Sequence, residues 1–108
     1  MNENDKDWLA CAIDGEGTIS ISKRGDIQIA VYNTNKEYVE KAARLMDCSI
    51  YPLKYRTNKI IWSAYVCKRM KVLKIIKTIE SKLIIKKEKA KEVSDILLSY
   101  FEIKDIII

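Results

Sequence analysis

The chain has 108 residues, of which 48% are apolar and 32% charged, a balance typical of one globular domain rather than a disordered segment. It starts with polar residues and has no apolar run near the ~18 residues that cross a bilayer, so we expect no membrane association. Its three cysteines (Cys11, Cys48, Cys67) have no CxxC spacing, so we expect reduced core thiols in an intracellular protein. The net charge is +5 and histidine is absent, which excludes His-based zinc sites and Ser-His-Asp triads and leaves carboxylates, lysines, backbone groups and hard metal ions for any chemistry.

The beginning of the chain predicts a helix followed by a β-hairpin. Asp5 is a suitable N-cap, and apolar residues recur at helical spacing from Trp8 onward, which predicts a helix over residues 5–15. Over residues 17–33 β-branched and polar residues alternate, and Gly25 falls between the two runs, so we expect two strands joined by a tight turn. One face of this hairpin is apolar and the other is polar.

The middle of the chain repeats this order of elements. Capping residues open the segment 33–47, which then has apolar residues at helical spacing. Two further strands are expected over residues 49–56 and 60–67, and in the second of them apolar residues alternate from Ile60 to Val66. Pro52 cannot donate a ladder hydrogen bond, so we expect the first of these strands at a sheet edge or with a bulge.

Two more helices complete the predicted order. Apolar residues have helical spacing over residues 68–83 and again over 87–101. The resulting order is αββαββα with an extra C-terminal helix, and each αββ half repeats the other in element order although not in sequence. We therefore expect a single α+β domain over residues 1–108, built on an antiparallel sheet.

Positive charge is concentrated in residues 54–91. This stretch has thirteen Lys or Arg and only two Glu, a net charge of +11, whereas the segments before and after it each have a net charge of −3. Such a concentration predicts a polyanionic partner, most plausibly nucleic acid. The alternative is compositional, since 16 Lys and 18 Ile are also what an AT-rich genome or a heat-adapted proteome produces.

The segment LACAIDGEG, residues 9–17, places two carboxylates beside two glycines at the end of the first predicted helix. It resembles the LAGLIDADG motif of the homing endonucleases, whose fold has the order αββαββα. Two further segments, IAVYNTNKEYVEKA at residues 29–42 and KLIIKKEKAKEV at residues 82–93, are similar to the end of that family's second strand and the start of its late helix. The resemblance covers nearly the whole chain, and one motif copy implies the single-motif, homodimeric type.

The resemblance implies a metal site at the end of the first helix. In the family, two copies of this helix pack about a two-fold axis, and each delivers one carboxylate to divalent metal ions beside the scissile phosphates. Glu16 matches this acid and the carbonyl of Gly15 matches a backbone ligand; hard oxygen ligands suit Mg²⁺, which activates water. Asp14 is expected to bond around the helix end. The residues expected in the dimer interface are Trp8, Ala10, Cys11, Asp14 and Gly15.

The polar face of the sheet is expected to read double-stranded DNA in the major groove, as in the family. A homodimer then implies a palindromic or nearly palindromic target. The expected DNA-binding residues are Ser20, Ser22, Arg24, Gln28, Tyr32, Lys54, Arg56, Ser63, Tyr65, Lys87 and Lys89. The last two open the final helix and are expected to bind phosphate rather than bases.

The sequence departs from the family at several catalytic positions. Asn35 stands where the family often has Gln near the metal-bound water, and Val39 where some members have an assisting arginine. Ile84 falls at the position of a catalytic lysine, for which Lys82 and Lys86 on neighbouring turns are the candidate replacements. These departures concern the rate of cleavage rather than the fold.

The leading interpretation is a metal-dependent, site-specific DNA endonuclease. A second is a DNA-binding protein without cleavage, or an RNA-binding intron maturase, on the same fold. A third is a small structural α+β protein whose lysines are compositional. Glu16 favours the first interpretation, because a protein that only binds has no need of this acid. Intein splice-junction residues do not frame the chain, so we expect an intron-encoded or free-standing gene.

Overall fold

The computed structural model describes the backbone of residues 1–54 and 59–107 and the side chains of residues 1–54 and 59–102. In chain order the elements are α1 (Glu3–Glu16), β1 (Gly17–Ile21), β2 (Ile27–Asn33), α2 (Lys36–Met46), β3 (Ile50–Lys54), β4 (Ile60–Val66), α3 (Arg69–Ile79), the 3₁₀ turn η1 (Glu80–Lys82) and α4 (Lys87–Ile107). The predicted αββαββα order with an extra C-terminal helix is confirmed, and the fold class is α+β.

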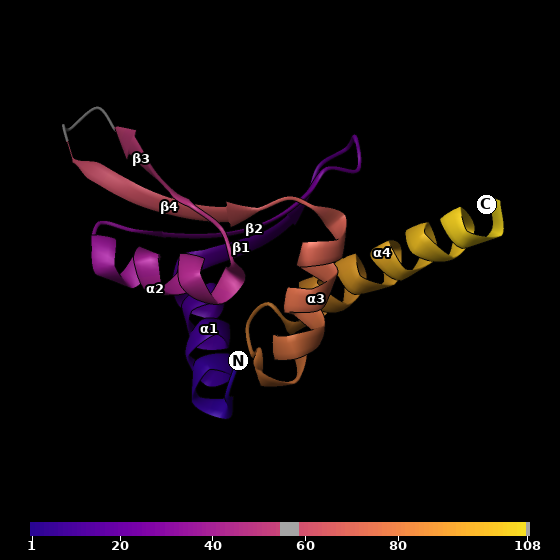
Figure 1. The fold of residues 1–108 in the computed structure, drawn as a ribbon, viewed down its shortest axis with the longest axis horizontal. Coiled ribbons are helices and arrows are strands. Elements are labelled where there is room, and N and C mark those ends of the chain that lie inside the picture. The colour runs from indigo at the N-terminus through magenta and orange to yellow at the C-terminus, as the bar shows by residue number, and fades with distance from the viewer. Residues whose placement is uncertain (55–58, 108) are drawn as a thin grey trace.

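The four strands form one antiparallel sheet in the order β1-β2-β4-β3. The second strands of the two αββ halves, β2 and β4, pair in the middle of the sheet, which gives the halves the arrangement of a repeat. The strand that contains Pro52, β3, lies at an edge, as its sequence predicts. Figure 1 shows α1, α2 and α3 against one face of the sheet. The opposite face, called the open face below, is not covered by them.

Two glycines fix the first αββ half. Gly25 has a φ of 87° in the β1–β2 turn, where its N–H donates to the carbonyl of Ser22 at 2.9 Å, as a tight turn requires. A Cβ on Gly17 would lie 2.6 Å from the carbonyl oxygen of Ala30 and 2.9 Å from Cα of Ile13. The end of α1 can therefore approach β2 this closely only because residue 17 has no side chain.

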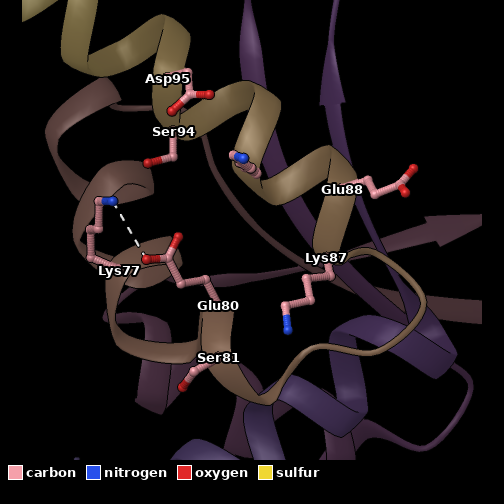
Figure 2. A pocket seen from close by; sticks show the side chains of 8 residues that line it. Lys77, Glu80, Ser81, Lys87, Glu88, Ser94 and Asp95 are labelled. Atoms are coloured by element: carbon pink, nitrogen blue, oxygen red, sulfur yellow. Dashed lines mark hydrogen bonds and ion pairs between the residues drawn. The ribbon is translucent and has the colours of Figure 1, made fainter.

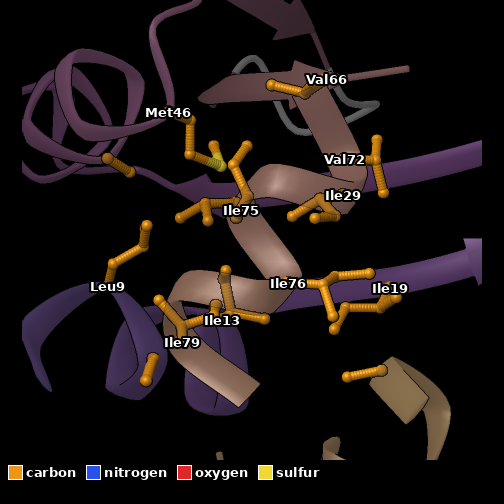
Figure 3. Packing of buried hydrophobic residues seen from close by; sticks show 14 of the residues in the cluster. Leu9, Ile13, Ile19, Ile29, Met46, Val66, Val72, Ile75, Ile76 and Ile79 are labelled. Atoms are coloured by element: carbon orange, nitrogen blue, oxygen red, sulfur yellow. The ribbon is translucent and has the colours of Figure 1, made fainter. Parts of the chain in front are cut away.

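The hydrophobic core lies between the covered face of the sheet and the helices (Figure 3). The sheet contributes Ile19, Ile29 and Val66, α1 contributes Leu9 and Ile13, and α3 contributes Val72, Ile76 and Ile79. The strand residues alternate with period two and the helical residues recur every three or four positions, so each element buries one face. This core holds the C-terminal end of α1 against the start of β1.

Three predicted helix boundaries are wrong. α1 begins at Glu3, because the side chain of Asn2 rather than Asp5 caps it, accepting a hydrogen bond from the Asp5 N–H at 2.8 Å. α3 ends at Ile79 and continues as the η1 turn, although periodic apolar residues run further. α4 continues to Ile107 and projects from the body of the molecule in Figure 1.

The three cysteines are free thiols. Cys48 is half-buried and packs against the core, whereas Cys11 and Cys67 are exposed, so the prediction of core thiols is wrong for Cys11 and Cys67. Cys11 lies on the face of α1 that is turned away from the sheet's core contacts, which the odd cysteine count could not indicate. In the part of the chain that the structure describes, no helix is long and apolar enough to cross a membrane.

Candidate functional site

The carboxylate of Glu16 is exposed at the C-terminal end of α1, where the helix meets the sheet. It lines a shallow hollow of about 380 Å³ together with Tyr32, Asn33, Thr34 and Ile61. Tyr32 and Ile61 belong to the open face of the sheet, whereas Asn33 and Thr34 link β2 to α2. The motif acid therefore lies at the edge of the surface on which a ligand of the sheet would rest.

The donors at this position fit a hard divalent ion in kind but not in number. The Glu16 carboxylate and the Gly15 carbonyl are oxygen ligands of the type that Mg²⁺ prefers. Across residues 1–54 and 59–102, however, no three His, Cys, Asp or Glu side chains are grouped closely enough to hold a metal ion. One chain thus supplies a single acidic ligand at this point, and a complete site needs donors from elsewhere.

Asp14 joins the end of α1 to the segment that precedes α4. Its carboxylate accepts hydrogen bonds from the N–H of Ile84 at 2.7 Å and of Lys86 at 3.0 Å. Burial raises the pKa of the Asp14 carboxyl, but the N–H groups of Ile84, Lys86 and Ile85 and the charge of Lys86 outweigh it, so the pKa lies below its ordinary value. The expected structural role of Asp14 around the helix end is confirmed.

The two candidate lysines occupy different ends of α1. The ammonium of Lys86 donates to the carbonyl oxygen of Asp14 at 2.8 Å, two residues before Glu16. The ammonium of Lys82 is instead ion-paired with Glu3 at 2.9 Å and Asp7 at 2.7 Å. Asp7 precedes Glu16 by nine residues, about 13 Å along a helix axis. Lys86 is therefore fixed at the C-terminal end of α1, the end at which Glu16 lies, whereas Lys82 is paired farther back along the helix.

Asn35 is the N-cap of α2, and its side-chain oxygen is used in that cap. Its side-chain oxygen accepts from the N–H of Tyr38 at 3.1 Å, and its own N–H donates to the side chain of Asn33 at 2.8 Å. Asn33 and Thr34, rather than Asn35, line the hollow with Glu16. Sequence reasoning missed both, although their place directly before a helix cap could have indicated them. Val39 is fully buried in the core.

Tyr38 lies close to the motif end of α1. Its ring packs against Trp8 with the centroids 5.1 Å apart, and Lys41 lies 4.6 Å over the Trp8 ring. Burial, followed by the nearby charges of Glu16 and Cys11, raises the pKa of the Tyr38 phenol above its ordinary value. No local pattern in the sequence marks this phenol, because core helices often contain tyrosine at such spacing.

The strand register decides which predicted DNA-binding residues share the open face. Ser20 pairs with Gln28 across β1 and β2. Tyr32 pairs with Ser63 and Tyr65 pairs with Ala30 across β2 and β4, so both tyrosines lie on the same face as Ser20 and Gln28. Thr18 lies on the same face, as the alternation of β1 predicts, and so do three residues that the sequence did not indicate, namely Tyr51, Leu53 and Ile61. The side chains of β3 were missed because the run around Pro52 does not alternate clearly.

Three of the predicted DNA-binding residues are placed differently. Lys54 pairs with Ile60 and so lies on the opposite face of the sheet. Ser63 is on the open face but only 3% exposed, since it lies between Tyr32 and Tyr51. The hydroxyl of Ser22 accepts from the N–H of Asp26 at 3.1 Å within the turn that also exposes Arg24. Arg56 lies outside the described residues.

The lysines at the start of α4 face a different part of the molecule. A hollow of about 570 Å³ lies between α3 and α4, and Lys87 and Lys91 line it (Figure 2). Its α3 side has an ion pair of 3.4 Å between Lys77 and Glu80. Lys89 is paired with Glu92 at 3.3 Å. These lysines are on the helical side of the molecule, apart from the open face.

The surface of α1 expected in a dimer is only partly free. Ala10 is buried in the core of its own chain and Trp8 is half-buried against Tyr38. The exposed part is a hollow of about 400 Å³ lined by Asp7, Cys11, Asp14, Gly15, Lys82, Ile84 and Ile85. The two isoleucines are 85% and 74% exposed, an unusual exposure for adjacent large apolar side chains.

Comparison with solved structures identifies the fold. The chain superposes on the homing endonuclease I-CvuI in complex with its target with a TM-score of 0.74 and 18% identity, over 96% of this chain and 74% of that one. For the archaeal intron-encoded I-Vdi141I complexed with DNA, the TM-score is 0.73 and the identity 17%, over 94% of this chain and 72% of that one. For the group I intron-encoded I-CeuI complexed with DNA, the TM-score is 0.65 and the identity 18%, over 96% of this chain and 56% of that one.

The sequence by itself is more isolated. No protein-family model matches it, and none of the curated proteins is similar enough to count as a relative. The structural similarity agrees with the fold that the resemblance at residues 9–17 implies. The chain has the LAGLIDADG homing endonuclease fold.

Proposed function

We propose that this protein is a metal-dependent, site-specific DNA endonuclease that acts as a homodimer on a palindromic or nearly palindromic site. The observation that carries the proposal is the place of Glu16. Its exposed carboxylate ends the motif helix in a hollow that two residues of the open sheet face, Tyr32 and Ile61, also line. A duplex resting on the open face would bring a phosphate to this acid.

The residues at this end of α1 would have different roles in cleavage. Glu16 and the Gly15 carbonyl would hold Mg²⁺, which when bound lowers the pKa of a water and offsets the charge of the phosphate. The Lys86 ammonium, fixed beside the Asp14 carbonyl at 2.8 Å, would stabilise negative charge that develops on the phosphate. Asn33 and Thr34 offer polar groups that would orient a water in the same hollow.

A second copy of the chain would complete the site. Two copies related by a two-fold axis would bring two Glu16 carboxylates together if the α1 helices pack through Cys11 and Gly15. The exposed Ile84 and Ile85 beside this surface would be buried by the partner. The homing endonucleases with this fold have been determined with DNA, and one complex of I-CvuI was determined in the presence of Mg with the DNA not cleaved.

The test is cleavage of a duplex recovered by in vitro selection on the wild-type protein. Glu16→Gln is expected to abolish Mg²⁺-dependent cleavage while the affinity for the duplex and the unfolding midpoint stay near wild type. Glu40→Gln on the exposed surface of α2 makes the same chemical change away from the site and should cleave normally. Cleavage that persists in Glu16→Gln would overturn the assignment of the acid.

A second candidate is a DNA-binding protein without cleavage. The observation that favours it is that Val39, at the position of the family's assisting arginine, is fully buried in the core and cannot reach a phosphate. A wild-type protein that binds the selected duplex tightly but never cuts it, at any Mg²⁺ concentration, would decide for this candidate. Preferential binding to a structured intron RNA would decide instead for a maturase.

A further inference from the structure

The open face of the sheet has two chemically different halves. On β1 and the adjoining end of β2 it presents the hydrogen-bonding side chains of Thr18, Ser20 and Gln28. On the rest of the face, around β3 and β4, it presents aromatic and aliphatic side chains. We call this second half the tyrosine patch; its members are Tyr32, Tyr51, Leu53, Ile61 and Tyr65.

The tyrosine patch is contiguous and packed against itself. The rings of Tyr51 and Tyr65 have centroids 5.3 Å apart and are tilted by 31°. Leu53 pairs directly with Ile61 across β3 and β4. The hydroxyl side chain of Ser63 lies in the middle and is buried by its neighbours. Exposed aromatic and aliphatic groups thus form a defined surface rather than scattered side chains, which indicates a binding site.

The charges around the patch indicate the chemistry of its partner. None of the described strand residues on the open face is charged. Positive side chains lie at the ends of the strands instead, with Lys23 and Arg24 in the β1–β2 turn, Lys59 before β4 and Lys68 after it. A partner that fits this pattern has phosphates at its margins and apolar groups between them. In the major groove of DNA, the apolar group on the base edges is the thymine C5-methyl.

We propose that the tyrosine patch binds thymine methyl groups in the major groove, so that each half-site of the target has thymines where the duplex crosses β3 and β4. This inference rests on the proposed function, because the duplex must lie on the open face. Residues two apart on a strand are about 7 Å apart, close to two steps of the roughly 3.4 Å rise per base pair. Tyr51 and Leu53 would therefore meet every second base pair.

The test removes methyl groups and nothing else. Replacing each thymine of the selected duplex by deoxyuridine, one at a time, deletes the C5-methyl but leaves base pairing and every hydrogen-bonding group unchanged. At thymines facing the patch, we expect the Kd to rise about three- to fivefold for each methyl lost. At thymines facing the polar half, we expect no change in Kd.

A matched pair of variants links the effect to the patch. Leu53 and Ile60 are both exposed aliphatic residues of the same hairpin, 39% and 43% exposed, but they lie on opposite faces of the sheet. In Leu53→Ser the difference between thymine and deoxyuridine is expected to disappear at one position of each half-site. In Ile60→Ser it is expected to remain. Because both residues are exposed, neither change should unfold the protein, which thermal unfolding checks.

The possible outcomes separate this inference from the proposed function. If selection recovers no duplex at all, the proposed function fails together with the inference. If a duplex is recovered but its affinity does not depend on any methyl group, only the thymine contact is overturned. Tighter binding to a single-stranded RNA, with no difference between uridine and ribothymidine, would indicate that the tyrosines stack on bases and would also overturn the proposal.

Discussion

Lys86 makes two hydrogen bonds to Asp14, one from its backbone and one from its side chain. Its backbone N–H donates to the Asp14 carboxylate at 3.0 Å, and its ammonium donates to the Asp14 carbonyl oxygen at 2.8 Å. The side chain of Asp14 thereby fixes the segment before α4. The backbone of Asp14 in turn fixes the lysine beside the end of α1. Stability and the position of a charge at the C-terminal end of α1 depend on the same residue pair.

Asp14→Asn is expected to destabilise the fold by about 1–3 kcal/mol at pH 7, because an amide NH₂ would replace one of the two oxygens that accept from Ile84 and Lys86. The pKa of Asp14 is lower in the folded state, so its ionised form stabilises the fold above about pH 4 and this contribution is lost as the pH falls through the folded pKa. Urea unfolding should show the two proteins converging below pH 4. Asp5→Asn, at the other end of α1, should cost less at pH 7, and a difference that persists unchanged at pH 3 would contradict this account.

Replacing Lys86 should impair cleavage more than replacing Lys82. Lys86→Met removes an ammonium held at the same end of α1 as Glu16. Under the proposed function we expect roughly a 100-fold lower single-turnover rate, with little change in stability because the backbone N–H of residue 86 still bonds to Asp14. Lys82→Met removes the ion pairs with Glu3 and Asp7, so its main effect should be on thermal unfolding. An equal fall in the cleavage rate of both variants would contradict the expectation that only Lys86 acts in cleavage.

A bulky side chain at Cys11 should separate the subunits. Cys11 is exposed in the hollow that Gly15, Ile84 and Ile85 also line, so Cys11→Trp would obstruct the packing of two α1 helices. Sedimentation velocity should give a monomer, and cleavage should be lost with it. Cys67→Trp, at an exposed cysteine after β4, is the matched control and should remain dimeric. A wild-type protein that is monomeric both free and on DNA would remove the basis for a shared site.

Ser94→Ala should leave stability unchanged or raise it by about 1 kcal/mol. The Ser94 side chain faces the hollow between α3 and α4 (Figure 2), is buried, and has no hydrogen-bond partner among the described residues. Removing an unpaired buried hydroxyl relieves its desolvation cost. Ser99→Ala, an exposed position on the same helix, is the control for helix propensity. A loss of more than 1 kcal/mol in Ser94→Ala would show that a group in the hollow bonds to this hydroxyl.

The sequence predicts the elements of this fold well because each is encoded locally. The alternation from Ile60 to Val66 correctly assigns the covered face of β4, and Gly25 correctly marks the turn of the first hairpin. The edge position of β3 also follows from Pro52. In these cases the period of the apolar residues, or the loss of one N–H, is sufficient for the inference.

The candidate site is less predictable because it depends on contacts between distant segments. Lys82 finds Glu3 and Asp7 more than 70 residues away in sequence, and no local pattern indicates this ion pair. Lys54 lies on the unexpected face because the register of β3 is set by its pairing with β4 rather than by its own weak alternation. Ser63 looks like a free polar residue until the neighbouring strands cover it.

The missing side chain at Gly17 has a consequence for how such a protein can diversify. At Gly17 the helix that ends in Glu16 and strand β2 meet backbone to backbone, with no space for even a methyl group. The side chains of Tyr51, Leu53 and Tyr65, on β3 and β4, are exposed and do not take part in that junction. Under the proposed function, substitutions on these strands would change which duplex is preferred without moving the acid, so target choice and bond cleavage could evolve separately.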